Sequence, residues 1–185
     1  MIIPDDNCIL YFGRDRDAFR FLSHFWPAPI TLDGESWPTV EHYYQAQKSD
    51  NHGYRQAIRA ALTPGQAKRL AAPPGAPRRV SHHSWFRAHG REPRVDWDAV
   101  KLDVMRRADH AKFAQNPDLA ELLLATADAE LIEDSPSDRF WGTGRDGQGL
   151  NWAGRVLMEV RDSLKRSGPQ RPLPGEGRYS GREAG

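Results

Sequence analysis

The spacing of apolar residues predicts a chain built mainly from helices. Apolar side chains recur at intervals of three and four over about residues 96–115 and 153–164, which is the period of an amphipathic helix. Thr63-Pro64 supplies an N-cap followed by a proline at the first helical position, so another helix is expected to begin there. Two shorter helices are predicted at about residues 54–62 and 118–125.

Short apolar runs predict a few strands between the helices. Residues 9–12 are followed by Gly13, and residues 131–133 precede a polar loop, as is typical of strands. Residues 30–37 predict a tight hairpin, because the central Asp33-Gly34 pair readily adopts the positive φ angles of its turn. The predicted fold class is therefore α+β, a compact and predominantly helical single domain with a few short strands.

Composition narrows the class of protein. The length of 185 residues suits one domain, predicted over residues 1–167, and the glycine- and proline-rich residues 168–185 predict a disordered tail. The net charge of +1 gives the protein no overall positive potential with which to bind a nucleic-acid duplex or an anionic membrane. The single cysteine, Cys8, excludes an intramolecular disulfide and a cysteine-based zinc site. Since no apolar run has the length of a membrane span and no leader pattern is present, we expect a soluble cytoplasmic protein.

Residues 37–48, Trp-Pro-Thr-Val-Glu-His-Tyr-Tyr-Gln-Ala-Gln-Lys, contain the strongest candidate for chemistry. Thr39 is a suitable N-cap, and no glycine or proline follows within the segment, so a helix is expected to run through Lys48. At about 100° per residue, Gln45 lies about 40° and Lys48 about 20° from the direction of Glu41. These polar groups therefore form one stripe on one face of the helix.

Two interpretations of this stripe are open. Glu41 and Lys48 can form a solvent-facing charged stripe that only improves solubility. Alternatively they form a functional pair, because the other residues of the helix are mostly uncharged and typical of a buried segment. Buried charges are costly unless they are paired or used. The residues alone do not decide between the two.

The second candidate is the glycine-rich segment 138–151. Its alternating glycines allow backbone N–H groups to approach a ligand closely, while Trp141 offers a flat stacking surface and Asn151 an amide at the start of a helix. The segment is not a dinucleotide fingerprint, since no βαβ unit surrounds it, and it lacks the Gly-Lys-Ser/Thr of a Walker loop. An ordinary surface loop is an equally good interpretation.

Two basic features are weaker candidates. Arg14 follows Gly13 at the end of a strand and is placed to hold a phosphate, although a solvated arginine is the commoner outcome. Prolines and glycines over residues 71–94 predict a long loop, whose arginines and histidines surround Trp85 and Phe86. Such a loop binds a nucleotide phosphate or single-stranded nucleic acid, or is simply solvated. No metal-binding pattern is present, and no cofactor is expected.

Four blocks of the sequence resemble the NADAR superfamily, the YbiA-like N-glycosidases. They occur in the family's order and span roughly residues 10–164, and the block over residues 37–48 is the most specific. The blocks are Leu22-Ser23-His24-Phe25; residues 37–48; residues 96–101 with Val104-Met105; and residues 141–147 with Asn151 and Gly154.

The resemblance implies a compact, mainly helical α+β domain that hydrolyses a C–N glycosidic bond to ribose. Family substrates are ribosylamino-pyrimidine phosphate intermediates of riboflavin synthesis, or ADP-ribose attached to guanine, including guanine in nucleic acid. We assign catalysis to Glu41, Lys48 and Asp138. The predicted substrate-binding residues are Gly13, Arg14, Ser23, Phe25, Trp37, Tyr44, Trp141, Gly142, Gly144 and Asn151.

In this scheme Glu41 stabilises positive charge at ribose C1′ or activates water, and Lys48 protonates the base or attacks C1′ to form an imine. Asp138 holds a ribose hydroxyl or a water, Trp141 stacks on the base, and the glycine amides and Arg14 hold phosphate. The chain departs from close family members at Leu150 and Thr143 and in its longer 71–94 loop, so its substrate stays open. A non-catalytic module that binds ADP-ribose or NAD is the alternative from another class.

Overall fold

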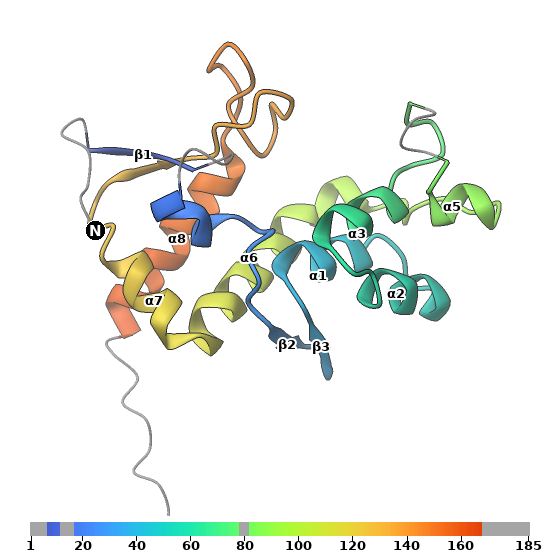
Figure 1. Cartoon of the computed structure of the whole chain (residues 1–185), viewed down its shortest axis with the longest axis horizontal. Helices are drawn as coiled ribbons and strands as arrows, with labels where there is room; N and C mark the ends of the chain where they lie inside the picture. Colours follow the sequence, from blue (N-terminus) through green and yellow to red (C-terminus); the bar gives the residue numbers. More distant parts are fainter. Residues whose placement is uncertain (1–6, 12–16, 78–81, 168–185) are drawn as a thin grey trace, which may run out of the picture.

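The computed structural model of the protein describes residues 7–11, 17–77 and 82–167 (Figure 1). The predicted tail at 168–185 and the Gly13-Arg14 pair lie outside these ranges. Within the described ranges, no helix is both long enough and apolar enough to cross a membrane.

Two long helices form the centre of the molecule. Helix α6 (Trp97–Gln115) packs against α8 (Trp152–Ser167), and α7 (Pro117–Leu124) contacts both. On the other side of α6 lies a second helical layer, seen at the right of Figure 1. Its helices are α1 (Val40–Ala46), which contacts α6 directly, and α2 (His52–Arg59) and α3 (Pro64–Leu70), which pack on α1.

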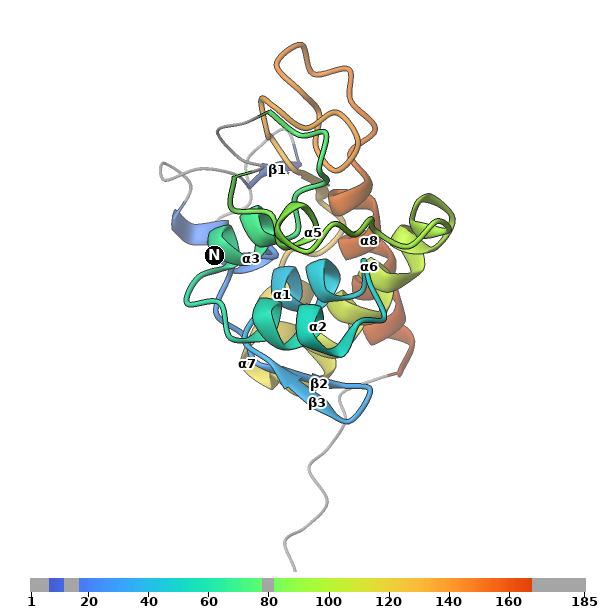
Figure 2. The ribbon, with the colours of Figure 1, turned by 90° about the vertical axis from the view of Figure 1, so that its right-hand side faces the viewer.

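The strands form two small sheets. Strand β1 (Cys8–Leu10) pairs in parallel with β4 (Glu130–Ile132), with Ile9 opposite Leu131. Strands β2 (Ile30–Leu32) and β3 (Glu35–Trp37) form an antiparallel hairpin. The hairpin and the loop that follows β4 lie at opposite ends of the molecule in both views (Figures 1 and 2). Two further helices are short: η1 (Asp17–Leu22), a 3-10 helix, and α5 (Trp85–Ala88).

Aromatic side chains fill much of the core. Trp37, Tyr43, Tyr54 and Phe86 are completely buried, and they belong to one continuous apolar cluster that extends from β1 to α8. Phe86 stacks on Tyr54 with ring centroids 4.6 Å apart. Most of the aromatic residues therefore stabilise the fold by burying large apolar surfaces.

The predicted fold class is confirmed, and so are the predicted helix N-caps and the hairpin turn. Thr39 and Thr63 cap α1 and α3, each side-chain oxygen accepting a backbone N–H three residues on. The hairpin turn has its positive φ angles at Asp33 (54°) and Gly34 (77°), as predicted. The expected long loop at 71–94 contains the short helix α5, which the sequence did not predict.

The prediction that the opening helix runs through Lys48 is wrong. Helix α1 ends at Ala46 with Gln47 as its C-cap. The carbonyl of Lys48 instead accepts the backbone N–H of Arg94 at 2.8 Å, so a contact with a distant segment replaces the next helical turn. Lys48 is held in a turn rather than on a helix.

Asn151 and Gly154 fix the end of β4 against α8. The Asn151 side chain donates from Nδ2 to the carbonyl of Leu131 and accepts at Oδ1 from the backbone N–H of Glu133, both at 2.9 Å. A Cβ atom at Gly154 would overlap the Leu131 carbonyl oxygen. Only a glycine therefore allows α8 to approach the strand this closely.

Replacing Gly154 tests this close approach. Gly154→Ala is expected to lower the free energy of unfolding by about 1–3 kcal/mol, because the added methyl group forces β4 away from α8. Chemical denaturation measures the change. Gly75→Ala is the matched control, since a Cβ at that exposed position meets no atom within 4 Å. Equal stability of the two variants would contradict this account of the packing.

Candidate active site

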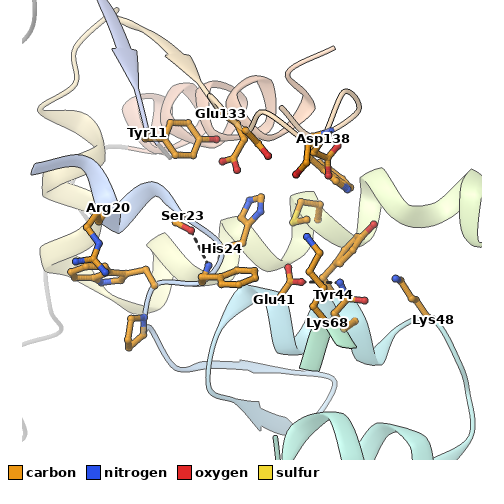
Figure 3. Close-up of a pocket in the computed structure, with 18 residues that line it drawn as sticks. Tyr11, Arg20, Ser23, His24, Glu41, Tyr44, Lys48, Lys68, Glu133 and Asp138 are labelled. Carbon is orange, nitrogen blue, oxygen red and sulfur yellow. Dashed lines mark hydrogen bonds between the residues drawn. The ribbon is translucent and has the colours of Figure 1, made fainter. Parts of the chain in front are cut away.

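A cavity of about 1070 Å³ lies between α1 and the loop that follows β4 (Figure 3). Residues of α1 and the turn after it form one wall, and Glu133, Asp138 and Trp141 form the facing wall. Side chains from α3 and α6 also reach the cavity, and the segment between η1 and β2 closes one end. The volume is large enough for a ribosylated base with its phosphate.

Helix α1 supplies a buried carboxylate to the cavity. Glu41 is only 5% exposed and accepts a hydrogen bond from Gln45 Nε2 at 2.8 Å, one helical turn on. It has no ion-pair partner in the part of the chain that the structure describes. The other amide atom, Gln45 Oε1, is buried and accepts no hydrogen bond from any described residue. Glu41 therefore offers a carboxylate to a ligand in the cavity.

Lys48 lines the same wall beside two aromatic rings. Its Nζ lies 5.9 Å from the ring centroid of Tyr44 and 5.8 Å from that of Trp97. Burial lowers the pKa of Lys48 to about 8, against the opposing effect of Glu41, and nearby lysines lower it further. A substantial fraction of this amine is therefore neutral near physiological pH, as a lysine nucleophile requires.

The facing wall carries Asp138 and Trp141. One Asp138 oxygen, Oδ1, accepts the backbone N–H groups of Phe140 at 2.9 Å and Trp141 at 2.8 Å, which fixes the turn that presents the indole. Trp141 meets the Tyr44 ring edge-on at 5.4 Å and the His24 ring at 6.4 Å. Its indole therefore connects the two walls.

A buried ion pair holds His24 in the cavity wall. His24 Nε2 lies 3.0 Å from Oδ2 of Asp109, a fully buried residue of α6. Burial alone would lower the pKa of His24, but the Asp109 carboxylate outweighs it and raises the pKa above the ordinary value. The buried Lys112 Nζ donates to the carbonyls of Phe21 (2.6 Å) and Ser23 (2.9 Å), so the segment before His24 is fixed as well.

The structure gathers most of the predicted site residues around this one cavity. Those that line it are Glu41, Lys48, Asp138, Ser23, Phe25, Tyr44 and Trp141. Four others do not line it: Trp37, Gly142, Gly144 and Asn151. Gly13 and Arg14 lie outside the described residues. The stripe of Glu41, Gln45 and Lys48 faces one cavity as predicted, although Lys48 is not helical.

The four residues away from the cavity have packing contacts instead. Trp37 is completely buried, with its indole N–H 3.4 Å from the Leu32 carbonyl, and Asn151 binds the end of β4. The Gly144 N–H donates to the Ser135 carbonyl, and a Cβ at Gly142 would lie 2.6 Å from the Glu133 carbonyl oxygen. These glycines allow the loop to fold on itself, so the prediction that their amides hold phosphate does not match their contacts.

Two other expectations also change. Leu150 is 49% exposed and Thr143 packs beside the Glu133 carbonyl, and neither lines the cavity. These departures from the family pattern therefore lie away from the candidate site. In the 71–94 loop, Phe86 packs on Tyr54, and no described residue of the loop lines the cavity.

Several cavity residues were not predicted from the sequence, among them Glu133 and His24. Glu133 directly follows β4, and an acidic residue at the end of a buried strand is a signal that could have been used. His24 lies in the Leu22-Ser23-His24-Phe25 block, but no role was predicted for it. Its partner, Asp109, lies 85 residues away, so the pair has no local signature. Lys68, Tyr11 and Arg20 also line the cavity.

Comparisons with known proteins agree with the resemblance. The sequence matches the NADAR domain over residues 10–165. It is 40% identical to the N-glycosidase YbiA of Escherichia coli over 158 residues, which cover 85% of this chain and 89% of that protein. It is 40% identical over 160 residues to a riboflavin biosynthesis protein of Vibrio vulnificus. This match covers 86% of the chain but only 40% of the Vibrio protein.

A solved structure gives the same result for the fold. The NMR structure of E. coli YbiA superimposes with a TM-score of 0.72 at 36% sequence identity, and the match covers 92% of each chain. The predicted kinship with N-glycosidases is thereby confirmed in both sequence and fold. The chain belongs to the NADAR family.

Proposed function

We propose that this protein is an N-glycosidase that hydrolyses the bond between ribose C1′ and a base nitrogen. The observation that carries the proposal is the pairing of two groups in one cavity, the buried carboxylate of Glu41 and the amine of Lys48. A surface stripe would not be buried in this way, and a core would not retain an unpaired carboxylate. The names of the relatives support the same reaction class.

Glu41 is suited to the positive charge that develops on the sugar. Breaking the C1′–N bond gives the ribose an oxocarbenium character, and a carboxylate in a cavity of low dielectric constant stabilises that charge strongly. The same carboxylate is able to take a proton from water that attacks C1′.

Lys48 has two possible roles in this reaction. Its ammonium form can donate a proton or a hydrogen bond to the departing base, while its neutral form can attack C1′ and open the ribose ring to an imine. Asp138, on the facing wall, is proposed to hold a ribose hydroxyl or the attacking water, with Trp141 stacked on the base.

The proposed substrates are ribosylamino-pyrimidine phosphates of riboflavin synthesis. Relatives named as riboflavin biosynthesis proteins support this choice. Lys68 and Arg20, which line the cavity, supply positive charge for the phosphate in place of the glycine amides. ADP-ribosylated guanine is the second candidate, because the cavity continues past Ser23 to Arg20 and Trp26 and has room for a larger ligand.

A base-release assay tests the function. The purified protein is incubated with a ribosylamino-pyrimidine phosphate, with NAD and with an ADP-ribosylated guanine oligonucleotide, and free base is measured by chromatography. We expect release from the pyrimidine substrate. Tight binding of ADP-ribose in calorimetry without release from any of the three would instead indicate a non-catalytic binding module.

Removing the Glu41 charge tests its role. Glu41→Gln keeps the shape of the side chain and its contact with Gln45, and it is expected to lower kcat by about 10²–10⁴-fold because charge stabilisation at C1′ is lost. Steady-state base release measures the effect. Glu121→Gln, on the exposed surface of α7, is the matched control and should retain wild-type turnover. Wild-type kcat in a folded Glu41→Gln protein would falsify the assignment.

Reductive trapping separates the two roles of Lys48. If the amine attacks C1′, cyanoborohydride added during turnover reduces the imine and leaves a sugar adduct on Lys48, which peptide mass spectrometry locates. Because burial lowers the pKa of Lys48 to about 8, the fraction of neutral amine able to attack C1′ increases as the pH rises toward that value. No adduct in active wild-type protein would favour direct attack by water, and an adduct on Lys68 would reassign the nucleophile.

A further inference from the structure

Glu133 occupies a rigid position in the wall that faces Glu41 (Figure 3). Its backbone is held on both sides: its N–H donates to Asn151 Oδ1, and its carbonyl accepts the N–H groups of Ser135 (2.8 Å) and Thr143 (3.0 Å). These bonds engage the main chain and leave the carboxyl group free to line the cavity. The fold thus fixes the point from which this side chain reaches a ligand.

Burial makes the charged form of Glu133 costly. It is the largest influence and raises the pKa of Glu133 to about 7; the Asp138 carboxylate also raises this pKa, while His24, Lys68 and the Tyr11 hydroxyl lower it without cancelling the effect of burial. The Tyr11 hydroxyl points toward the carboxyl group in Figure 3. The titratable groups that act on Glu133 are His24, Asp138, Lys68 and Tyr11, and His24 is itself paired with Asp109.

The two carboxyl groups therefore differ in their surroundings. Glu41 accepts an amide N–H from Gln45. Glu133 lies across the cavity, where burial favours its protonated form although His24, Lys68 and Tyr11 oppose that effect. Glycosidases use such a pair, one carboxylate beside the sugar and one carboxylic acid beside the leaving group.

We propose that Glu133 is the general acid that protonates the departing base nitrogen, an inference that rests on the proposed glycosidase function. The Glu133 proton moves to the base nitrogen, the C1′–N bond breaks, and its electron pair stays on that nitrogen. Water adds to C1′ and loses a proton to Glu41. Exchange with solvent then returns a proton to Glu133 and removes one from Glu41, so the net reaction consumes one water.

The other proton donors of the cavity are less suited to this step. Asp138 Oδ1 is already engaged by two backbone N–H groups. His24 Nε2 is engaged by Asp109 at 3.0 Å. Assigning the base proton to Glu133 leaves Lys48 available for attack on C1′ or for an anionic group of the substrate.

The test is the pH dependence of base release from the ribosylamino-pyrimidine phosphate. Glu133 carries its proton below a pH of about 7 and loses it above, so wild-type kcat is expected to fall on the alkaline side. Glu133→Gln has no proton to give, so its kcat should be lower by about 10²–10⁴-fold and should lose the alkaline decline. KM should stay within about threefold of the wild-type value, since Gln fills the same space.

Two further variants keep the result interpretable. Glu130→Gln, at an exposed position of β4, the strand before Glu133, should retain the wild-type rate and pH profile. Glu133→Asp retains a carboxylic acid and should recover part of the rate together with an alkaline decline, even if Glu133→Gln folds poorly. The assignment would be overturned if kcat still fell at alkaline pH in folded Glu133→Gln. It would also be overturned if the pH at which kcat falls were the same in Glu133→Asp as in the wild type. Failure of the wild type to release base would overturn the glycosidase function itself, and the inference with it.

Discussion

The close contact between α8 and the end of β4 is the constraint on which the site depends. Gly154 removes the side chain that would collide with the Leu131 carbonyl, and Asn151 then satisfies the backbone groups on either side of Ile132. An unpaired backbone group buried there would cost about as much as a lost hydrogen bond. Once β4 is fixed, the loop after it can place Glu133, Asp138 and Trp141 opposite α1.

Burial gives this cavity its chemistry. Desolvation disfavours the charged form of any ionisable group, so it lowers the pKa of Lys48 to about 8 and raises that of Glu133 to about 7. The pKa values of the amine and the acid are therefore close to neutral pH, where proton transfer and nucleophilic attack are efficient. His24, which contacts Asp109 at 3.0 Å, lowers the pKa of Glu133 and so opposes part of the effect of burial. The cavity thus combines a buried carboxylate with an acid and an amine whose pKa values both lie near neutral pH.

Local features of the fold were predictable from the sequence. The Thr39 cap, the Asp33-Gly34 turn and the common face of Glu41 and Gln45 depend only on neighbouring residues, and the structure has all three. Lys48 lies beyond the end of α1, where its carbonyl accepts the backbone N–H of the distant Arg94, and no feature of the neighbouring sequence indicates this contact.

Features that depend on distant segments were not predictable. The parallel pairing of β1 with β4 joins residues more than a hundred positions apart, and it places Tyr11 beside Glu133. The glycine-rich loop was interpreted as a ligand cradle because its composition suits one. In fact Gly142 and Gly144 are needed for packing against the Glu133 and Arg139 segments. A glycine pattern alone does not distinguish close approach to a ligand from close approach to the protein itself.

The central claim is that ribose C1′ binds between Glu41 and Glu133. A crystal structure of the Glu41→Gln variant with an uncleaved ribosylamino-pyrimidine phosphate tests it most directly. The account predicts that C1′ lies in this cavity, that the leaving nitrogen is about 3 Å from a Glu133 carboxyl oxygen, and that the base contacts Trp141. A sugar bound outside the cavity, or a base nitrogen turned away from Glu133, would contradict the account.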